Sequence, residues 1–154
     1  MRYSIITPTI VRSSLKQLCD SIDRQTNQDW EHLIAVDLPV EKITPEKIAI
    51  LDSVRHPQRT IRHCGQQHDD FGCTCRHNLW PHAKGDYIHN MDDDNWYADA
   101  QVLELLEVVT QPWASFVRLF KGDPQQPYPG DSCNFMVSRS LPASRWPNDY
   151  SLPC

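Results

Sequence analysis

The chain alternates short β-branched runs, typical of buried strands, with stretches whose apolar residues recur at helical spacing. The runs end at Pro or Gly turns or at polar residues, as strands do. Four of them predict strands over residues 3–7, 31–37, 59–64 and 87–91.

Three helices are predicted between these strands. The first begins at Ser13 or Ser14 and ends near Gln25, because residues 15, 18, 19 and 22 are apolar. The second spans residues 45–54, with Thr44 as its cap, and the third is a short piece over 75–83.

The C-terminal part predicts fewer elements. A helix over 98–110 has Val102, Leu105, Leu106 and Val109 on one face. Strands are expected over 114–120 and 132–138, and the remaining Pro-rich segments are expected to be irregular.

This order predicts one α/β domain with a mostly parallel, Rossmann-like sheet and flanking helices, and 154 residues suit a single domain. In such sheets ligands bind outside the carboxyl ends of the strands. The segment Thr7-Pro8-Thr9, Asp37 and the run 92–94 all lie at predicted carboxyl ends. We therefore expect them to share one crevice.

Composition narrows the possible partners. Fifteen Lys and Arg against twenty Asp and Glu give a net charge of −5, which disfavours nucleic-acid binding without sequence preference. The N-terminus lacks the apolar core of a signal peptide, and no stretch reaches the roughly 20 apolar residues of a membrane helix. We expect no transmembrane segment, a cytoplasmic location and six reduced cysteines.

Three consecutive acids stand out in "YIHNMDDDNWY", residues 87–97. Neighbouring carboxylates repel unless a positive group lies beside them, and oxygen ligands suit Mn²⁺ or Mg²⁺. In an extended turn Asp92 and Asp94 point the same way and share one ligand site, while Asp93 points the other way. The alternative is a solvated turn before the next helix. Trp96 and Tyr97 either contact a sugar or pack that helix.

Several separated segments resemble the family 2 glycosyltransferases of the GT-A fold. They are "YSIITPT", "SLKQLCDSIDRQTNQDWEHLIAVD" and "CRHNLWPHAKGDYIHNMDDDNWYAD", the last of which leads to the family's Asp-x-Asp motif. The likeness extends over roughly residues 3–141, and it is the order and spacing of the segments that make it specific.

The resemblance implies transfer of a sugar from a nucleoside-diphosphate sugar, most often a UDP-sugar, to an acceptor hydroxyl, with a bound divalent metal and inversion at the anomeric carbon. It also implies residue roles. Thr7, Pro8 and Thr9 line the nucleoside pocket, and Asp37 accepts a hydrogen bond from the base. Arg76 lies near the diphosphate, and Asp92 lies near the ribose or metal. Asp93 also contacts the donor, and Asp94 is the main metal ligand.

The chain departs from the family pattern in two places. His77 and Leu79 stand where the family has Asn and Gly. In the family, the catalytic base is a carboxylate shortly after the strand that resembles "CNFMVSRSL". In this chain the base is therefore Asp149, or lies beyond the sequence, or does not exist. Asp131, on the acceptor side, is a second candidate. We expect a nucleotide-binding half over 1–97 and an acceptor-side half over 98–154 that is either minimal or truncated.

Two other functions stay open. The first is a nucleotide-sugar-binding module without turnover, as part of a larger assembly. The second is a zinc-stabilised interaction domain, because "HCGQQHDDFGCTCRH" has three His and three Cys, although their spacing fits no common zinc motif. For that stretch a flexible loop over the donor is the favoured interpretation. The acceptor is a glycan, a lipid or a protein, and pairing with a second copy of the chain is possible.

Overall fold

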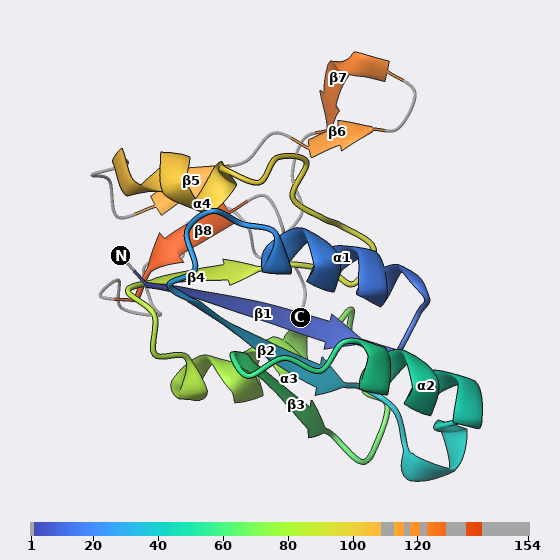
Figure 1. Cartoon of the computed structure of the whole chain (residues 1–154). Coiled ribbons are helices and arrows are strands. Elements are labelled where there is room, and N and C mark those ends of the chain that lie inside the picture. Colours follow the sequence, from blue (N-terminus) through green and yellow to red (C-terminus); the bar gives the residue numbers. More distant parts are fainter. Residues whose placement is uncertain (1, 109–112, 116–117, 121–122, 129–134, 140–154) are drawn as a thin grey trace.

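The structure, a computed structural model, describes residues 2–108, 113–115, 118–120, 123–128 and 135–139 (Figure 1). Its strands are β1 (Tyr3–Thr9), β2 (Trp30–Val36), β3 (Arg59–His63), β4 (Tyr87–Asn90), β5 (Trp113–Ser115), β6 (Arg118–Phe120), β7 (Asp123–Tyr128) and β8 (Phe135–Ser138). Its helices are α1 (Ser14–Asp23), α2 (Pro45–Ser53), α3 (Cys73–Leu79) and α4 (Val102–Leu105), with 3-10 turns η1 (Val40–Lys42), η2 (Trp80–His82) and η3 (Leu106–Val108).

The main sheet has six strands in the order β3-β2-β1-β4-β8-β5. The first four are parallel, and β8 runs antiparallel to both of its neighbours. Tyr3 on β1 is in register with Trp30 on β2 and Tyr87 on β4, so the three strands begin at the same level. This arrangement confirms the predicted α/β domain with a mostly parallel sheet.

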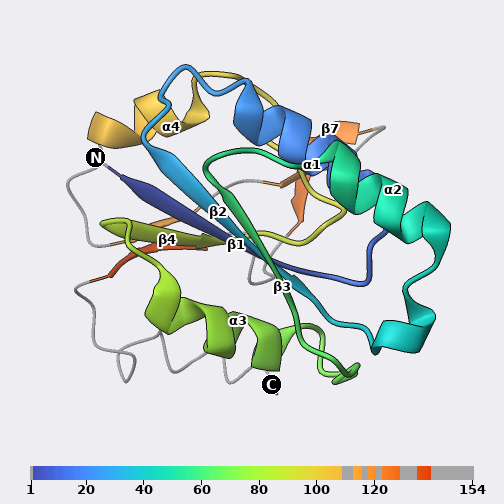
Figure 2. The ribbon, with the colours of Figure 1, turned by 60° about the horizontal axis from the view of Figure 1, so that its bottom comes forward.

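Helices cover both faces of the sheet, with α1, α2 and α4 on one side and α3 on the other (Figure 2). Each face has its own apolar core, because successive strand residues point to opposite sides. Ile5 and Ile34 pack in the core with α1 and α2, whereas Ile6 and Leu33 pack in the core with α3. The helices predicted between the first four strands are confirmed, and the Thr44 side chain caps α2 by accepting from Lys47 N.

A buried arginine joins α1 and α2 to the sheet. Arg59 donates from Nη2 to Asp23 Oδ1 at 2.6 Å and from Nη1 to the Val54 carbonyl at 2.5 Å. Its Nε donates to His32 Nδ1 at 3.0 Å. The other nitrogen of that imidazole, Nε2, therefore carries the proton and donates to Thr7 Oγ1 at 2.9 Å.

A second network fixes the amino end of the sheet. The Ser4 hydroxyl donates to Glu31 Oε1 at 2.6 Å and accepts from Gly85 N at 2.7 Å. Lys84 N also donates to Glu31 Oε1. A Cβ on Gly85 would lie 2.5 Å from Ser4 N, so only glycine allows this close approach. The contact sets where β4 begins, and with it the position of the acid run at its far end.

The helix predicted over 98–110 begins later than expected, at Val102. Residues 98–101 form a bend and turn because the segment after α1 binds their carbonyls. Gln25 Nε2 donates to the Asp99 carbonyl at 2.8 Å, and Thr26 N donates to the Ala100 carbonyl at 2.8 Å. The last predicted helical residues, 109 and 110, lie outside the described residues.

The predicted strand over 114–120 is two strands, β5 and β6, and residues 116 and 117 between them lie outside the described residues. The β6 strand pairs with β7 in a separate two-stranded sheet. The irregular structure expected for the Pro-rich stretch is therefore wrong at β7, which contains Pro124 and Pro127. Proline is compatible with an edge strand, where one side needs no donor.

The predicted strand over 132–138 is confirmed for 135–138, and 132–134 lie outside the described residues. None of the helices in the described part of the chain combines the length and the apolar character that a membrane crossing requires.

Candidate functional site

A cavity of about 430 Å³ opens at the carboxyl edge of the parallel strands. Four segments that are distant in the sequence contribute to its wall. They are the end of β1 with the following loop (Pro8, Thr9, Ile10 and Arg12), the residue after β2 (Asp37), the loop after β3 (Gln67, Asp69, Phe71 and Gly72), and the acid run after β4 (Asp92, Asp93 and Asp94). A second cavity of about 360 Å³ lies beside the start of β3, and no acid is among the described residues that line it.

The acid run is a tight turn. Asn95 N donates to the Asp92 carbonyl at 3.1 Å, so the alternation of an extended chain, which we expected, does not apply here. Asp93 is buried and its Oδ2 accepts from the Thr9 hydroxyl at 2.5 Å, whereas Asp94 is exposed. Burial raises the pKa of Asp93, with the Thr9 hydrogen bond and Arg12 acting in the opposite direction.

Two arginines flank the acids. Arg12 Nη1 lies 3.3 Å from Asp93 Oδ1 and 3.2 Å from Asp94 Oδ2. Arg76 pairs with Asp92 through Nη2 and donates from Nη1 to the Phe71 carbonyl at 2.7 Å. The Arg76 Nε is buried and has no hydrogen-bond partner among the described residues. Three carboxylates facing two guanidinium groups leave a surplus of negative charge at the turn.

The loop after β1 holds an unusual backbone conformation at Val11, whose φ is +60°. A β-branched residue in this left-handed region costs about 1–3 kcal/mol, so neighbouring contacts must enforce it. Val11 N donates to Thr9 Oγ1 at 2.8 Å, and Lys47 Nζ donates to the Val11 carbonyl at 3.2 Å. The turn brings Arg12 to the acids.

The loop after β3 lies against the end of β1. Gly72 has φ +79°, and a Cβ there would lie 2.4 Å from Pro8 Cγ, so this contact requires glycine. Asp37 Oδ1 fixes the middle of the loop by accepting from His68 N at 3.2 Å, and His68 Nδ1 lies 2.5 Å from the same oxygen. The Phe71 ring is 94% exposed at the cavity rim.

The structure brings together most of the residues selected from the sequence. The selected residues that line the cavity are Pro8, Thr9, Asp37, Asp92, Asp93 and Asp94. Arg76 pairs with Asp92 but does not itself line the cavity. Thr7 does not line the cavity. It lies two residues before Thr9, the last residue of β1, and its hydroxyl is buried against His32. Asp131 and Asp149 lie outside the described residues.

Other residues of the site were not selected. Arg12 is one of them, and its place just after the end of the first strand is the signal in the sequence that points to it. Gln67, Asp69 and Phe71 lie in the His- and Cys-rich loop, and nothing in their own pattern distinguishes them. Tyr97, considered as a sugar contact, is instead a core residue whose hydroxyl lies 2.7 Å from His89 Nδ1.

The sequence model described as "Glycosyl transferase family 2" matches residues 4–141, which is most of the chain. The chain belongs to this glycosyltransferase family. Comparison with curated proteins finds no match. Family 2 membership agrees with the resemblance seen in the segments around residues 3–9, 14–37 and 75–99.

Solved structures place this family 2 chain in the GT-A fold. It is similar to TarS 1-349 of S. aureus, with a TM-score of 0.70 and 14% identity over 90% of this chain and 47% of that one. A complex of TarS 1-349 with UDP-GlcNAc matches with a TM-score of 0.63 and 17% identity, covering 84% of this chain and 37% of the other.

A mannosyltransferase of Pyrobaculum calidifontis, PcManGT, in complex with GDP-Man and Mn²⁺, gives a TM-score of 0.58 and 19% identity over 76% of this chain and 35% of that one. The family 2 chain thus spans less than half the length of these structures.

Proposed function

We propose that this protein is a metal-dependent glycosyltransferase that transfers a sugar from a nucleoside-diphosphate sugar, with UDP as the first candidate, to an acceptor hydroxyl with inversion. The observation that carries the proposal is the acid turn of Asp92, Asp93 and Asp94, placed between Arg12 and Arg76 in a cavity at the carboxyl edge of a parallel sheet. The family supplies the reaction class.

The donor set fits Mn²⁺ or Mg²⁺. These cations prefer carboxylate oxygens and retain coordination positions for phosphates, and the surplus negative charge of the turn favours a cation. Asp94 and Asp92 are the proposed ligands, since Asp93 is committed to Thr9. When bound, the cation supplies positive charge that stabilises the departing diphosphate.

The protein's own groups have distinct roles in this proposal. Arg12 and Arg76 supply positive charge beside the acid turn, which stabilises a departing diphosphate. Thr9 orients Asp93 and thereby the turn. Pro8 and Asp37 line the same cavity. In this proposal they contact the nucleoside, and an Asp37 carboxylate oxygen accepts an N–H of the base.

The two-part organisation extends this proposal. Within the part of the chain that the structure describes, the residues that line the cavity come from positions 8–94, which supports a nucleotide-binding half over 1–97. The half over 98–154 is then proposed to meet the acceptor, with Asp131 or Asp149 as the base that takes the proton from the hydroxyl.

The test measures binding of UDP by titration calorimetry with and without Mn²⁺. We expect Mn²⁺ to tighten binding by at least about tenfold, or about 1.4 kcal/mol. Asp94→Asn is expected to abolish this gain. The matched control is Asp20→Asn. Asp20 lies on α1, has a side chain that is 49% exposed, pairs with Lys16 and does not line the cavity.

Equal affinity with and without Mn²⁺, or an undiminished gain in Asp94→Asn, contradicts the proposal. A turnover assay then separates the enzyme from a module that only binds. Release of nucleoside diphosphate from a panel of sugar nucleotides supports the transferase. Metal-dependent binding with no release, even in the presence of candidate acceptors, supports the binding module.

A further inference from the structure

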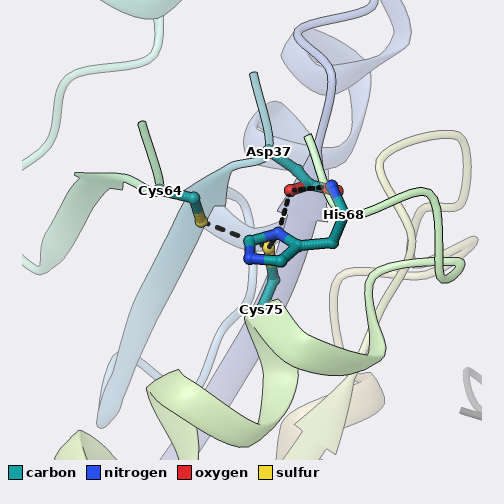
Figure 3. A group of neighbouring side chains, drawn as sticks. All are labelled: Asp37, Cys64, His68 and Cys75. Carbon is teal, nitrogen blue, oxygen red and sulfur yellow. Dashed lines mark hydrogen bonds and ion pairs between the residues drawn. The ribbon is translucent and has the colours of Figure 1, made fainter. Parts of the chain in front are cut away.

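Four potential metal ligands meet beside the cavity, and each comes from a different segment (Figure 3). Asp37 follows β2, Cys64 follows β3, His68 lies in the loop after β3, and Cys75 lies in the first turn of α3. One ligand atom from each of the four lies within 4.8 Å of all the others. The topology thus unites residues whose spacing along the sequence fits no common zinc motif.

Two distances in the cluster are close to those of a tetrahedral site, whereas the 2.5 Å between His68 Nδ1 and Asp37 Oδ1 must lengthen when an ion binds. Zinc binds thiolate sulfur at about 2.3 Å and imidazole nitrogen at about 2.0–2.1 Å, which places ligand atoms roughly 3.3–3.8 Å apart around a tetrahedron. The two sulfurs lie 3.2 Å apart, and Cys75 Sγ lies 4.0 Å from His68 Nδ1. Small side-chain movements therefore make room for an ion.

The chemistry of the ligands selects the kind of ion. Two sulfurs and one imidazole suit a borderline-soft metal such as Zn²⁺ and are poor ligands for Mg²⁺ or Mn²⁺. The acid turn offers only oxygen and selects the opposite class. The two sites are therefore expected to discriminate between metals.

Without an ion, the cluster is an unfavourable arrangement for thiolates. Burial raises the pKa of both thiols, and the Asp37 carboxylate nearby raises them further. A divalent cation reverses this preference because it binds both thiolates and the carboxylate, and it releases the thiol protons on binding.

We propose that Asp37, Cys64, His68 and Cys75 bind one structural Zn²⁺. The ion closes the loop of residues 64–75 onto the ends of β2 and β3. That loop carries Gln67, Asp69 and Phe71 to the cavity, so zinc orders one wall of the site. The proposal goes beyond the transferase function and does not depend on it. Asp37 has two carboxylate oxygens, so one can bind the ion while the other faces a base.

The experiment uses the whole chain purified with a reductant and without added metal chelator. We expect elemental analysis to find about one zinc per chain. After chelation, added Co²⁺ is expected to bind at one equivalent and to give the strong visible absorption of tetrahedral thiolate coordination, which octahedral oxygen sites lack. This measurement needs no variant.

Two variants and a control locate the site. Cys64→Ser and Cys75→Ser are each expected to lose at least about tenfold in Co²⁺ affinity. Cys73→Ser is the matched control, because Cys73 is in the same helix and outside the cluster. It is expected to retain full binding.

The proposal is overturned if the reduced chain neither contains zinc nor binds Co²⁺ tetrahedrally, or if both Cys variants bind as tightly as the original chain. A Cys64–Cys75 disulfide that forms in the presence of a reductant likewise overturns it. The outcome is independent of the transferase proposal, since UDP binding with Mn²⁺ is measured separately at Asp94.

Discussion

At the scale of single residues, His32 shows how burial fixes a protonation state. Its Nδ1 accepts from Arg59 and its Nε2 donates to Thr7, so the neutral ring is fully hydrogen-bonded. Burial lowers the pKa of His32 well below 6.5, and the nearby Arg59 charge lowers it further. The native ring therefore stays neutral at pH values where the unfolded ring binds a proton.

This difference predicts a pH dependence of stability. Below about pH 6.5 the unfolded chain binds one proton more than the native chain, so the unfolding free energy falls by up to about 1.4 kcal/mol per pH unit as the pH decreases. Above pH 6.5 this contribution is complete and constant. Urea unfolding between pH 7 and 5 measures the slope.

The His32→Gln variant provides the comparison. It lacks the titrating ring and keeps a donor for Thr7. We expect a lower unfolding free energy overall, and a pH slope smaller by the contribution of one proton, about 1.4 kcal/mol per pH unit. The same slope in the variant would assign the pH dependence to other groups.

The sequence predicted the place of those site residues that lie at the ends of strands, because the carboxyl ends of parallel strands meet at one edge of the sheet. Pro8 and Thr9 end one parallel strand, and Asp37 and the acid run follow two others, so all of them had to meet at one edge. The prediction failed for Arg12, because the left-handed turn at Val11 that directs this side chain depends on the Lys47 contact, which lies far along the sequence.

At the scale of elements, hydrogen bonds of Arg59 connect helices α1 and α2 to the sheet. One guanidinium binds the ends of α1 and α2 and the ring on β2, and its side chain is only 1% exposed. Helices α1 and α2 also pack on the apolar core, but these hydrogen bonds fix where their C-terminal ends lie.

We predict that Arg59→Met destabilises the protein by about 3–5 kcal/mol, because Asp23, His32 and the Val54 carbonyl lose their shared partner. Urea unfolding at pH 7 measures this change. Arg55→Met is the control: Arg55 is exposed, and its one ion pair among the described residues is with Asp52, so its loss is expected to cost less than about 1 kcal/mol. Equal losses in the two variants would contradict the role given to Arg59.

The first four strands and the helices between them were predictable because each is indicated by the spacing of apolar residues within its own segment. The start of α4 was not, because Gln25 and Thr26 bind carbonyls about 74 residues away. The β6 and β7 pair was missed for a related reason: proline lowers strand propensity, and pairing with another strand overrides it.

At the scale of the whole molecule, contacts that stabilise the fold and residues that form the candidate site lie at opposite ends of the parallel strands. The amino ends of β1, β2 and β4 are joined through Ser4, Glu31 and Gly85, whereas the cavity lies at the carboxyl ends of the same strands. Substitutions at one end are therefore expected to leave the other end unchanged.

Ser4→Ala tests this separation. The change removes a buried hydroxyl and leaves Gly85 N without its acceptor, so we expect a loss of about 1–3 kcal/mol in unfolding free energy. Binding of UDP with Mn²⁺, measured by calorimetry, is expected to match that of the original chain. A reduced metal effect in a folded Ser4→Ala protein would show that the two ends are coupled.

The pairing of Arg12 with Asp94 bears on the sequence of events in a binding cycle. If a cation binds Asp94 as proposed, the Arg12 guanidinium would lose that partner and would be available to the phosphates of a donor. Binding would then be ordered, with the metal first and the donor second. Such an order predicts a donor on-rate that rises with metal concentration and then saturates.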